Sequence, residues 1–425
     1  MTAPTRLERT LPVILDELAA GPAPVYLDDV FARTAQMRQR PGWTFPERWI
    51  PMADITRSRA FVPAPPWRLL AIALTVLALV ATALVFVGTQ RRVPPPFGPA
   101  RNGLIPYVSA GDIYVGDPVT GKTRLLVGGS EDDAAPGFSP DGAHLAFIRD
   151  VGRAIGTTPA PVHLFVVRDD GTGLTRITTR PIPTLVWASW TPDGRRLAVV
   201  QPYDGVNQLE LYETDGAKPP HRITTAAGID SLTFRPPDGG QILFRALVDG
   251  RYGLFVMDAD GTNLQTLIVP TSGTDLGEDL NGATYSADGS RIFYQRWTPG
   301  SIQLWVMNAD GTDPHEFVSV PGQGWDGLPA PSPDGRWIAY WHVLNDRATQ
   351  RLAVVRADGT GPIILTGPEL SGNANWTWAP DSSKILMIPE SDGPGSAYLL
   401  DPMGGPETKV PWTSDLDLDW QRAAL

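Results

Sequence analysis

The clearest pattern in the chain is a succession of short apolar runs separated by turns rich in Gly and Asp, which fills residues 102–425. Typical runs are residues 145–148 (LAFI) and 337–341 (WIAYW), and each follows such a turn. Apolar runs of this length between turn residues are typical of buried β-strands. The pattern therefore predicts that this part of the chain is built from short strands rather than helices.

The turns return with a nearly fixed period. A Ser/Thr-Pro-Asp-Gly turn or a close variant occurs six times, and its Asp recurs at steps of 52, 45, 50, 46 and 47 residues. In such a turn Pro presets φ, Asp accepts hydrogen bonds from nearby backbone N–H groups, and Gly takes a positive φ. A period of this size indicates a repeat architecture. The repeated turn residues are Asp141, Gly142, Asp193, Gly194, Asp238, Gly239, Asp288, Gly289, Asp334, Gly335 and Asp381.

Each repeat has room for four short strands, with a second Asp/Gly turn before the last strand, as in residues 258–262 and 308–312. Four short strands in about 47 residues are typical of one β-propeller blade. The turns resemble the WD40-like propeller repeats of the TolB C-terminal domain and its relatives, over about three quarters of the chain. Three units depart from the pattern, with Ala287 in place of Pro, Ser382 in place of Gly, and an extra Pro at Pro236. The resemblance implies a propeller that works by interaction.

The ends of the repeat region supply one more blade. Residues 104–108, 112–115 and 123–126 match strands two to four of a blade, while residues 416–421, with Trp420 in the leading aromatic position, match strand one. Joining the two termini in one blade removes exposed strand edges. We therefore expect an all-β, seven-bladed propeller, or a six-bladed one if a terminal strand is misread.

A different pattern precedes the repeats. Residues 69–87 form a 19-residue stretch without charge, with Arg68 before it and Arg91 after it. As a helix it would be roughly 28 Å long, close to the hydrocarbon thickness of a bilayer. It predicts one transmembrane helix over residues 66–90. Residues 1–65 are expected to form a short α-helical segment, residues 91–101 a Pro-rich linker, and residues 102–425 the propeller.

Charge suggests how this chain is oriented. Residues 1–93 carry a net charge of +4 and residues 94–425 one of −15. The Arg residues nearest the span are evenly divided, with Arg57, Arg59 and Arg68 before it and Arg91, Arg92 and Arg101 after it, so the positive-inside rule does not choose an orientation. The net charges favour the basic N-terminal segment inside, and we expect a single-pass protein of the cell membrane with the propeller outside the cytoplasm. The acidic propeller also argues against nucleic-acid binding. The layout resembles that of transmembrane anti-sigma factors, which implies a cytoplasmic protein partner for residues 1–65, although that segment has no His or Cys zinc ligands.

The sequence offers little catalytic or metal-binding chemistry. It has no Cys, and its five His lack zinc-motif spacing. Asp258 and Asp260 belong to a turn without the remainder of a calcium loop, and neither a nucleophile elbow nor a phosphate-binding loop occurs. We therefore expect no catalytic residues, no cofactor and no metal. The five His are His144, His163, His221, His315 and His342.

Exposed aromatic residues are the remaining candidates for ligand contact. Trp297 and Trp325 fall in the predicted longer loops 296–300 and 321–328, whereas the other propeller Trp residues are expected to pack between blades. The predicted function is that of a membrane-anchored, non-enzymatic propeller that binds a protein or glycan ligand as a sensor or envelope scaffold. The alternative is a lyase-like carbohydrate-active enzyme that uses the central channel. A cluster of His, Asp or Arg at the axis would favour the enzyme, and an axis of Ala, Gly and Val would argue against it.

Overall fold

The computed structural model falls into two units, residues 1–88 and 89–425, which are described separately. It describes residues 71–77, 94–150, 161–223, 228–248, 250–270, 279–298, 301–318, 325–343, 349–365, 367–368, 374–389, 395–414 and 419–424.

In the first unit, residues 71–77 are helical and expose apolar side chains such as Leu74 and Leu77. Among the described residues, no helix combines the length and apolar character that crossing a membrane would require. The rest of the predicted span 66–90 and the whole predicted segment 1–65 lie outside the described residues.

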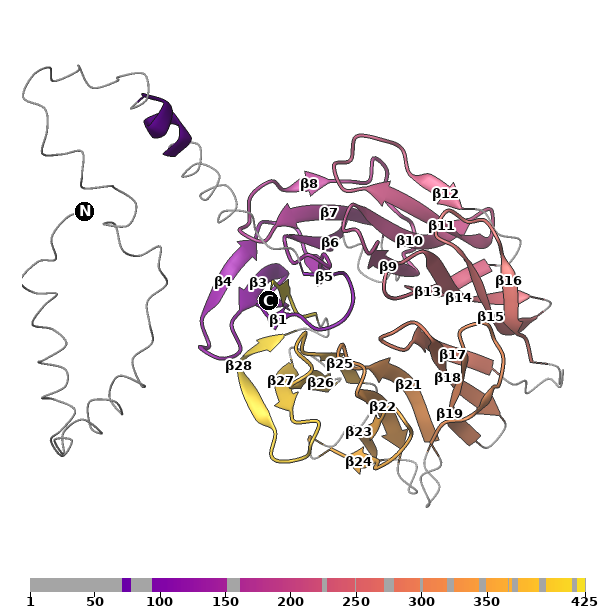
Figure 1. Ribbon diagram of the computed structural model, residues 1–425. Helices are drawn as coiled ribbons and strands as arrows, with labels where there is room; N and C mark the ends of the chain where they lie inside the picture. Colours follow the sequence, from indigo (N-terminus) through magenta and orange to yellow (C-terminus); the bar gives the residue numbers. More distant parts are fainter. Residues whose placement is uncertain are drawn as a thin grey trace, which may run out of the picture. The chain divides into compact units, whose positions relative to one another are not determined.

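The second unit is a ring of seven small antiparallel sheets, the blades of a β-propeller (Figure 1). Six of these sheets contain four consecutive strands, and the first contains three. The prediction of an all-β, seven-bladed fold is confirmed. In chain order the strands are β1 (Arg101–Asn102), β2 (Ile105–Ser109), β3 (Asp112–Gly116), β4 (Thr123–Val127), β5 (Asp133–Phe138), β6 (His144–Asp150), β7 (Val162–Arg168), β8 (Thr175–Arg176), β9 (Trp187–Trp190), β10 (Arg196–Tyr203), β11 (Val206–Glu213), β12 (His221–Ile223), β13 (Gly228–Phe234), β14 (Gln241–Val248), β15 (Arg251–Asp258), β16 (Gln265–Ile268), β17 (Asp279–Tyr285), β18 (Arg291–Thr298), β19 (Ser301–Asn308), β20 (His315–Glu316), β21 (Trp325–Pro331), β22 (Trp337–Val343), β23 (Gln350–Arg356), β24 (Ile363–Ile364), β25 (Ala374–Trp378), β26 (Ile385–Pro389), β27 (Gly395–Leu400), β28 (Thr408–Ser414) and β29 (Arg422–Ala423).

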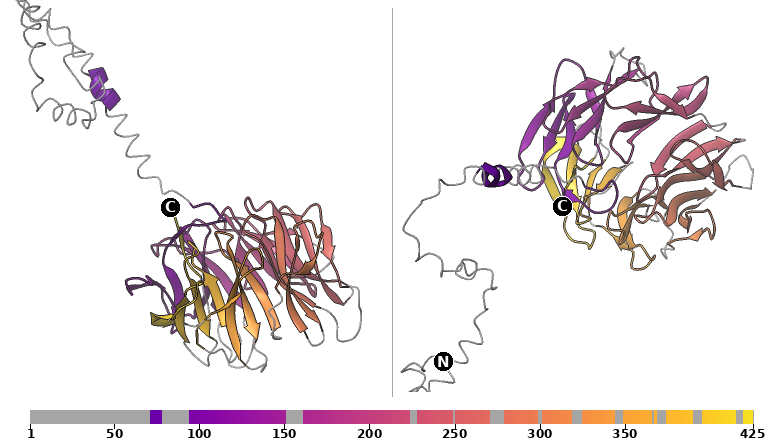
Figure 2. Two further views of the ribbon diagram at one scale, coloured as in Figure 1. Left: turned by 60° about the horizontal axis from the view of Figure 1, so that its bottom comes forward. Right: turned by 45° about the horizontal axis from the view of Figure 1, so that its top comes forward.

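The two ends of the propeller chain meet in the three-stranded blade. Strand β29 pairs antiparallel with β1, and Gln421 exchanges backbone hydrogen bonds of 2.9 Å with Gly103 and Leu104. The C-terminal segment thus joins the chain beside this blade, although β29 pairs with β1 in a two-stranded sheet separate from β2–β4, and Figure 2 shows the C-terminus at one face of the ring. Strand β29 begins after the predicted strand 416–421, and residues 416–418 of that predicted strand lie outside the described residues. Buried Trp420 also donates from Nε1 to the Gly103 carbonyl, at 3.1 Å.

The core lies between neighbouring blades. One apolar cluster joins Leu209 of the second four-stranded blade to Phe244 and Met257 of the third, and similar clusters lie at the other junctions. Because the middle strands are covered on both faces, they need apolar residues at successive positions rather than alternate ones. This explains the continuous run in β22, where Ile338, Ala339 and Tyr340 are all buried.

The repeated turns share one hydrogen-bonding pattern. In the turn after β21, the Ser332 hydroxyl donates to Asp334 Oδ1 at 2.6 Å and accepts from the Trp337 N–H at 3.0 Å, while Asp334 Oδ1 accepts from the Arg336 N–H. A hydroxyl at this position is therefore as much a part of the motif as Asp. The same pattern is built on Ser139, Thr191 and Ser286.

The turns also touch one another, so that they form a ring around the propeller axis. Gly239 has φ +73°, and a Cβ there would lie 2.4 Å from Pro192 of the preceding turn. Gly289 has φ +71°, and a Cβ there would lie 2.1 Å from the Pro236 carbonyl oxygen. Glycine is thus required both by its backbone angle and by the close approach. Ser382 takes its place once, at φ +65°, and accepts a hydrogen bond from the Asp334 N–H at 3.0 Å.

Replacing Ser332 with Ala should lower the free energy of unfolding by about 1–3 kcal/mol, because the Trp337 N–H loses the acceptor that the buried Ser332 supplies. The matched control is Thr360→Ala, which removes the same hydroxyl-to-Asp contact in an exposed outer turn and should cost less than about 1 kcal/mol. Urea denaturation measures both values. Equal losses would show that the ring of turns contributes no special stability.

The closing segment carries a carboxyl group with a shifted pKa. Asp419 accepts from the Phe138 N–H across the junction between the three-stranded blade and the blade β5–β8, and burial raises its pKa to about 6. The folded protein therefore keeps this proton up to a higher pH than the unfolded chain does. The contribution of Asp419 to stability is fully present below about pH 4 and is lost as the pH rises to about 6.

In Asp419→Asn the loss of stability between pH 4 and pH 6 should disappear, because Asn has no proton to release in this range. The variant should gain stability relative to the wild type between pH 4 and pH 6, by at most about 3 kcal/mol, since one pKa unit corresponds to about 1.4 kcal/mol. Denaturation curves at several pH values measure the difference. Parallel pH profiles for the two proteins would contradict the assignment.

Candidate functional site

The ring has two different ends. We call the end where the repeated turns meet the turn end, and the other the open end. The turn end is crossed by a strap, defined as residues 94–100. Arg422 Nη2 donates to the carbonyls of Pro95 and Gly98, at 2.9 and 2.7 Å, and the Ala100 N–H donates to the Pro380 carbonyl at 2.9 Å. Phe97 packs against the core between the second and third four-stranded blades. The strap therefore contacts blades on different sides of the ring.

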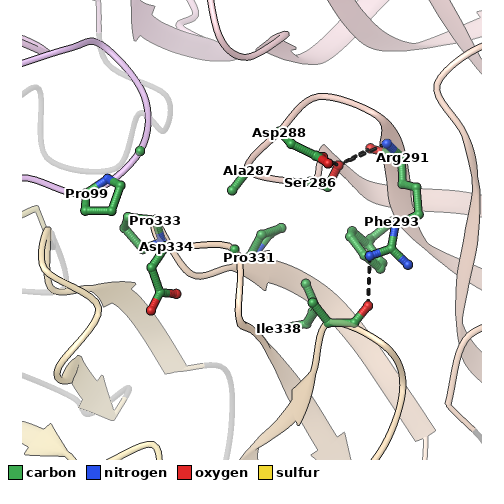
Figure 3. Close-up of a pocket in the computed structure, with 13 residues that line it drawn as sticks. Pro99, Ser286, Ala287, Asp288, Arg291, Phe293, Pro331, Pro333, Asp334 and Ile338 are labelled. Carbon is green, nitrogen blue, oxygen red and sulfur yellow. Dashed lines mark hydrogen bonds between the residues drawn. The ribbon is translucent and has the colours of Figure 1, made fainter.

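A cavity of about 380 Å³ lies beside the strap, between the turns after β17 and β21 (Figure 3). Its polar groups already have partners in the protein. Asp288 accepts from the Ser286 hydroxyl, which helps to lower its pKa, and the Arg291 guanidinium donates to the Ala357 carbonyl at 2.8 Å. The carboxylates here hold turns together, so this cavity offers little to a ligand.

A second cavity of about 380 Å³ is walled by the inner strands β9, β13 and β17, by β14, and by Leu328 of β21. It lies away from the turns, toward the open end. Its polar and exposed apolar lining residues are Trp187, Ser189, Ser231, Thr233, Arg245, Asn281, Thr284 and Leu328. Four blades therefore contribute to one concave surface beside the axis, which is a common location and size for a small-ligand site.

Irregularities of the inner strands shape this surface. The pairing register shifts in β5, β13, β17 and β21, and residues with positive φ occupy the same repeat position in three of them: Ala135, Gly282 and Leu328. β-bulges re-aim side chains and are frequent beside functional sites. Leu328 has φ 52°, is 42% exposed, and lies against Gly282, where a Cβ would be 3.1 Å from its Cδ2 atom. A large apolar side chain in this conformation is unusual and deserves a functional explanation.

The opposite rim carries Trp187, the first residue of β9, which pairs with Val200 and is 43% exposed. The cavity is therefore bordered by an indole on one side and by Leu328 on the other, with hydroxyl and amide groups between them. Exposed Trp is enriched where proteins contact ligands and partners, because it combines a large apolar face with an N–H donor.

The charged groups at the open end are paired with one another. Arg245 binds Asp230 and both carboxylate oxygens of Asp279, at 2.8 and 2.9 Å for the latter, and its guanidinium lies 3.4 Å from the centroid of the Tyr252 ring. Burial raises the pKa of Asp230, an effect that the Arg245 charge opposes.

Two other blades carry related pairs. Arg149 binds Asp133 at 2.6 and 2.8 Å, and His342 Nδ1 lies 2.6 Å from Asp326 Oδ1. In each pair the acid is on an inner strand and the partner on the adjacent strand. Burial raises the pKa of Asp133. The open end thus presents charges that are largely neutralised inside the protein.

The two predicted contact residues are placed differently from the expectation. Trp297 is not in a loop but near the end of β18, where it pairs with Ile302 and Asp279 and is half-buried. Trp325 begins β21 rather than lying in a loop, and its side chain is outside the described part. Trp297 is not among the described residues that line the open-end cavity. Sequence reasoning instead assigned Trp187 to packing between blades, as it did for the other Trp residues in strands or at the leading position of a turn.

In the portion of the chain that the structure describes, no group of three or more His, Asp or Glu side chains is arranged to hold a metal ion. The five His lie in four blades, with His144 and His163 on adjacent strands of one of them, and the side chains of His163 and His342 contact Thr178 and Asp326. Among the described residues that line the open-end cavity, Arg245 is the one ionisable side chain, and the others are apolar residues, hydroxyl residues and one amide.

Comparison with known proteins agrees with this architecture. Residues 183–361 match the family model described as PD40, TolB beta propeller domain. Within these residues the ring is similar to TolB propeller domains. No curated protein matches the chain.

Among solved structures, TolB from Acinetobacter baumannii is 17% identical, with a TM-score of 0.49 over 74% of this chain and 81% of that one. An oligogalacturonate lyase from Vibrio parahaemolyticus is 15% identical, with a TM-score of 0.54 over 73% of this chain and 92% of that one. A prolyl endopeptidase structure is 15% identical, with a TM-score of 0.56 over 84% of this chain and 56% of that one. At these identities the likeness concerns the fold alone.

Replacing Arg245 with Met should lower the free energy of unfolding by about 3–5 kcal/mol, because it leaves the partly buried Asp230 without its counter-charge. The control is Arg336→Met, which removes an exposed ion pair of 3.6 Å with Asp334 and should change stability by less than about 1 kcal/mol. Urea denaturation at pH 7 compares the two. A small loss of unfolding free energy in Arg245→Met would mean that water solvates Asp230 well enough without its counter-charge.

Proposed function

We propose that this chain is a membrane-anchored, non-enzymatic propeller that binds a protein or glycan ligand at its open end. One observation carries the proposal: the open-end cavity is bordered by exposed Trp187 and Leu328, held there by the inner strands of different blades. The strap crosses the turn end, so the open end is the accessible approach to the axis.

The chemistry of the cavity supports binding rather than catalysis. General acid–base catalysis needs a titratable group within reach of the substrate. Arg245 is the one ionisable side chain among the described residues that line the cavity, and it is held by Asp230 and Asp279. The remaining polar groups are hydroxyls and an amide, which recognise a ligand without exchanging protons at neutral pH.

The membrane part of the proposal rests on the sequence. Residues 69–87 contain no charged side chain, and the helical residues 71–77 expose apolar side chains. In this proposal the anchor holds the acidic propeller outside the cytoplasm, while residues 1–65 meet a protein partner inside. Protease treatment of intact cells, with a different tag at each terminus, tests this orientation. Loss of the C-terminal tag alone is expected, and protection of both tags until lysis would contradict it.

The binding function is tested with the full chain in nanodiscs, applied to arrays of defined oligosaccharides and of synthetic peptides. Trp187→Ala should weaken binding to whichever oligosaccharides or peptides on the arrays bind the wild-type protein. The expected loss is at least about tenfold, equivalent to about 1.4 kcal/mol. The control is Tyr203→Ala, which removes another exposed aromatic outside the cavity lining. Binding that is insensitive to Trp187→Ala would overturn the assigned site, and cleavage of a bound oligosaccharide would overturn the non-enzymatic assignment.

A further inference from the structure

We infer that the open-end cavity receives an uncharged sugar residue, with one face of its ring stacked on Trp187. This inference rests on the proposed binding function and adds the chemical class of the ligand. Three features of the cavity carry it: a single exposed indole, a set of hydroxyl and amide groups facing it, and the absence of a free charge among the described lining residues.

The indole supplies the apolar half of the site. Trp187 is 43% exposed and stands at the rim, while Trp190 in the same strand is used internally, donating from Nε1 to the Gly137 carbonyl at 3.0 Å. A pyranose ring carries C–H groups on its faces and hydroxyls around its edge. A flat aromatic surface is therefore its natural apolar partner, and the free edge hydroxyls then need hydrogen-bonding groups nearby.

The wall of the cavity supplies such groups. Asn281 uses its Oδ1 to accept from the Gly282 N–H at 2.8 Å, so its Nδ2 group is left to donate to a ligand. Its side chain is exposed. The Thr233 and Thr284 hydroxyls also line the cavity, and each can donate and accept. Ligand sites are typically mostly apolar with a few convergent polar groups of this kind.

The charges determine which sugars fit. Arg245 is the cation nearest the cavity, and Asp230 and Asp279 more than neutralise it. The surrounding residues 94–425 carry a net charge of −15. A carboxylate or phosphate on the ligand would meet repulsion and find no free counter-charge among the described lining residues. The site therefore favours neutral sugars over uronic acids and phosphorylated sugars.

A peptide ligand is the competing class. Grooves that bind extended Pro-rich peptides present several aromatic side chains in a row, because successive residues each need a pocket. Here Trp187 is the one aromatic with substantial exposure among the described lining residues. The volume of about 380 Å³ is near the lower limit of about 300 Å³ for ligand pockets, which suits the end of a short chain better than a long segment.

The test is calorimetric titration of the full chain in nanodiscs, since sugar-headed detergents would compete for the site. The probes are N,N′,N″-triacetylchitotriose, maltotriose and mannotriose, which are uncharged, with trigalacturonate as the acidic counterpart. At least one neutral trisaccharide should bind, and trigalacturonate should bind at least about tenfold more weakly, a difference of about 1.4 kcal/mol. Trp187→Ala should abolish the neutral-sugar signal, Asn281→Ala should weaken it severalfold, and Tyr203→Ala should leave it unchanged.

Folding and specificity are controlled with Trp187→Phe, which keeps an aromatic face and should retain part of the affinity, and with near-ultraviolet circular dichroism of each variant. Tight binding of trigalacturonate, or neutral-sugar binding that survives Trp187→Ala, would overturn the inference. Peptide binding that depends on Trp187, without sugar binding, would overturn the sugar assignment while preserving the proposed binding function. If neither sugars nor peptides bind, both the sugar assignment and the proposed binding function are overturned.

Discussion

Closure of the ring is the constraint on which the structure depends. Each blade is a small sheet whose middle strands are apolar on both faces, so no blade can bury its own surface; it needs a neighbour on either side. The last gap is filled by the C-terminal segment, through β29 pairing with β1 and through buried Trp420. Without that contact, the first and last blades would each expose the apolar face that now packs against the other, together with unpaired strand edges.

Closure also explains the turn end. The repeated turns are brought into contact with one another, and their Gly residues are needed for that contact as well as for a positive φ. Arg422 follows the closing segment directly and holds the strap through the Pro95 and Gly98 carbonyls. The same few C-terminal residues therefore complete the ring and hold the strap in place. As a result the strap crosses the turn end of the propeller and leaves the open end uncovered.

The candidate site follows from departures within this regular scaffold. The turns are nearly identical from blade to blade, whereas the inner strands differ in their bulges and in the residues placed on them. Leu328, Gly282 and Ala135 share one position and one backbone conformation but differ in size, and only some blades pair an acid on the inner strand with a base beside it. The repeats are thus constant where they pack and variable where they face the axis, which is the distribution expected of a binding scaffold.

The sequence by itself determined the repeat and the order of the strands, because these depend on turn chemistry and hydrophobic pattern that act locally. It favoured seven blades over six, and the structure decided for seven. It also determined which residues would form the turns. Only the tertiary structure decided which aromatic residue is exposed, since Trp187 and Trp190 look alike in sequence and differ only in what neighbouring blades leave uncovered. Likewise Arg245 meets Asp279 of the next blade, and Leu328 meets Gly282 of the previous one, through contacts across blade boundaries that no local pattern encodes.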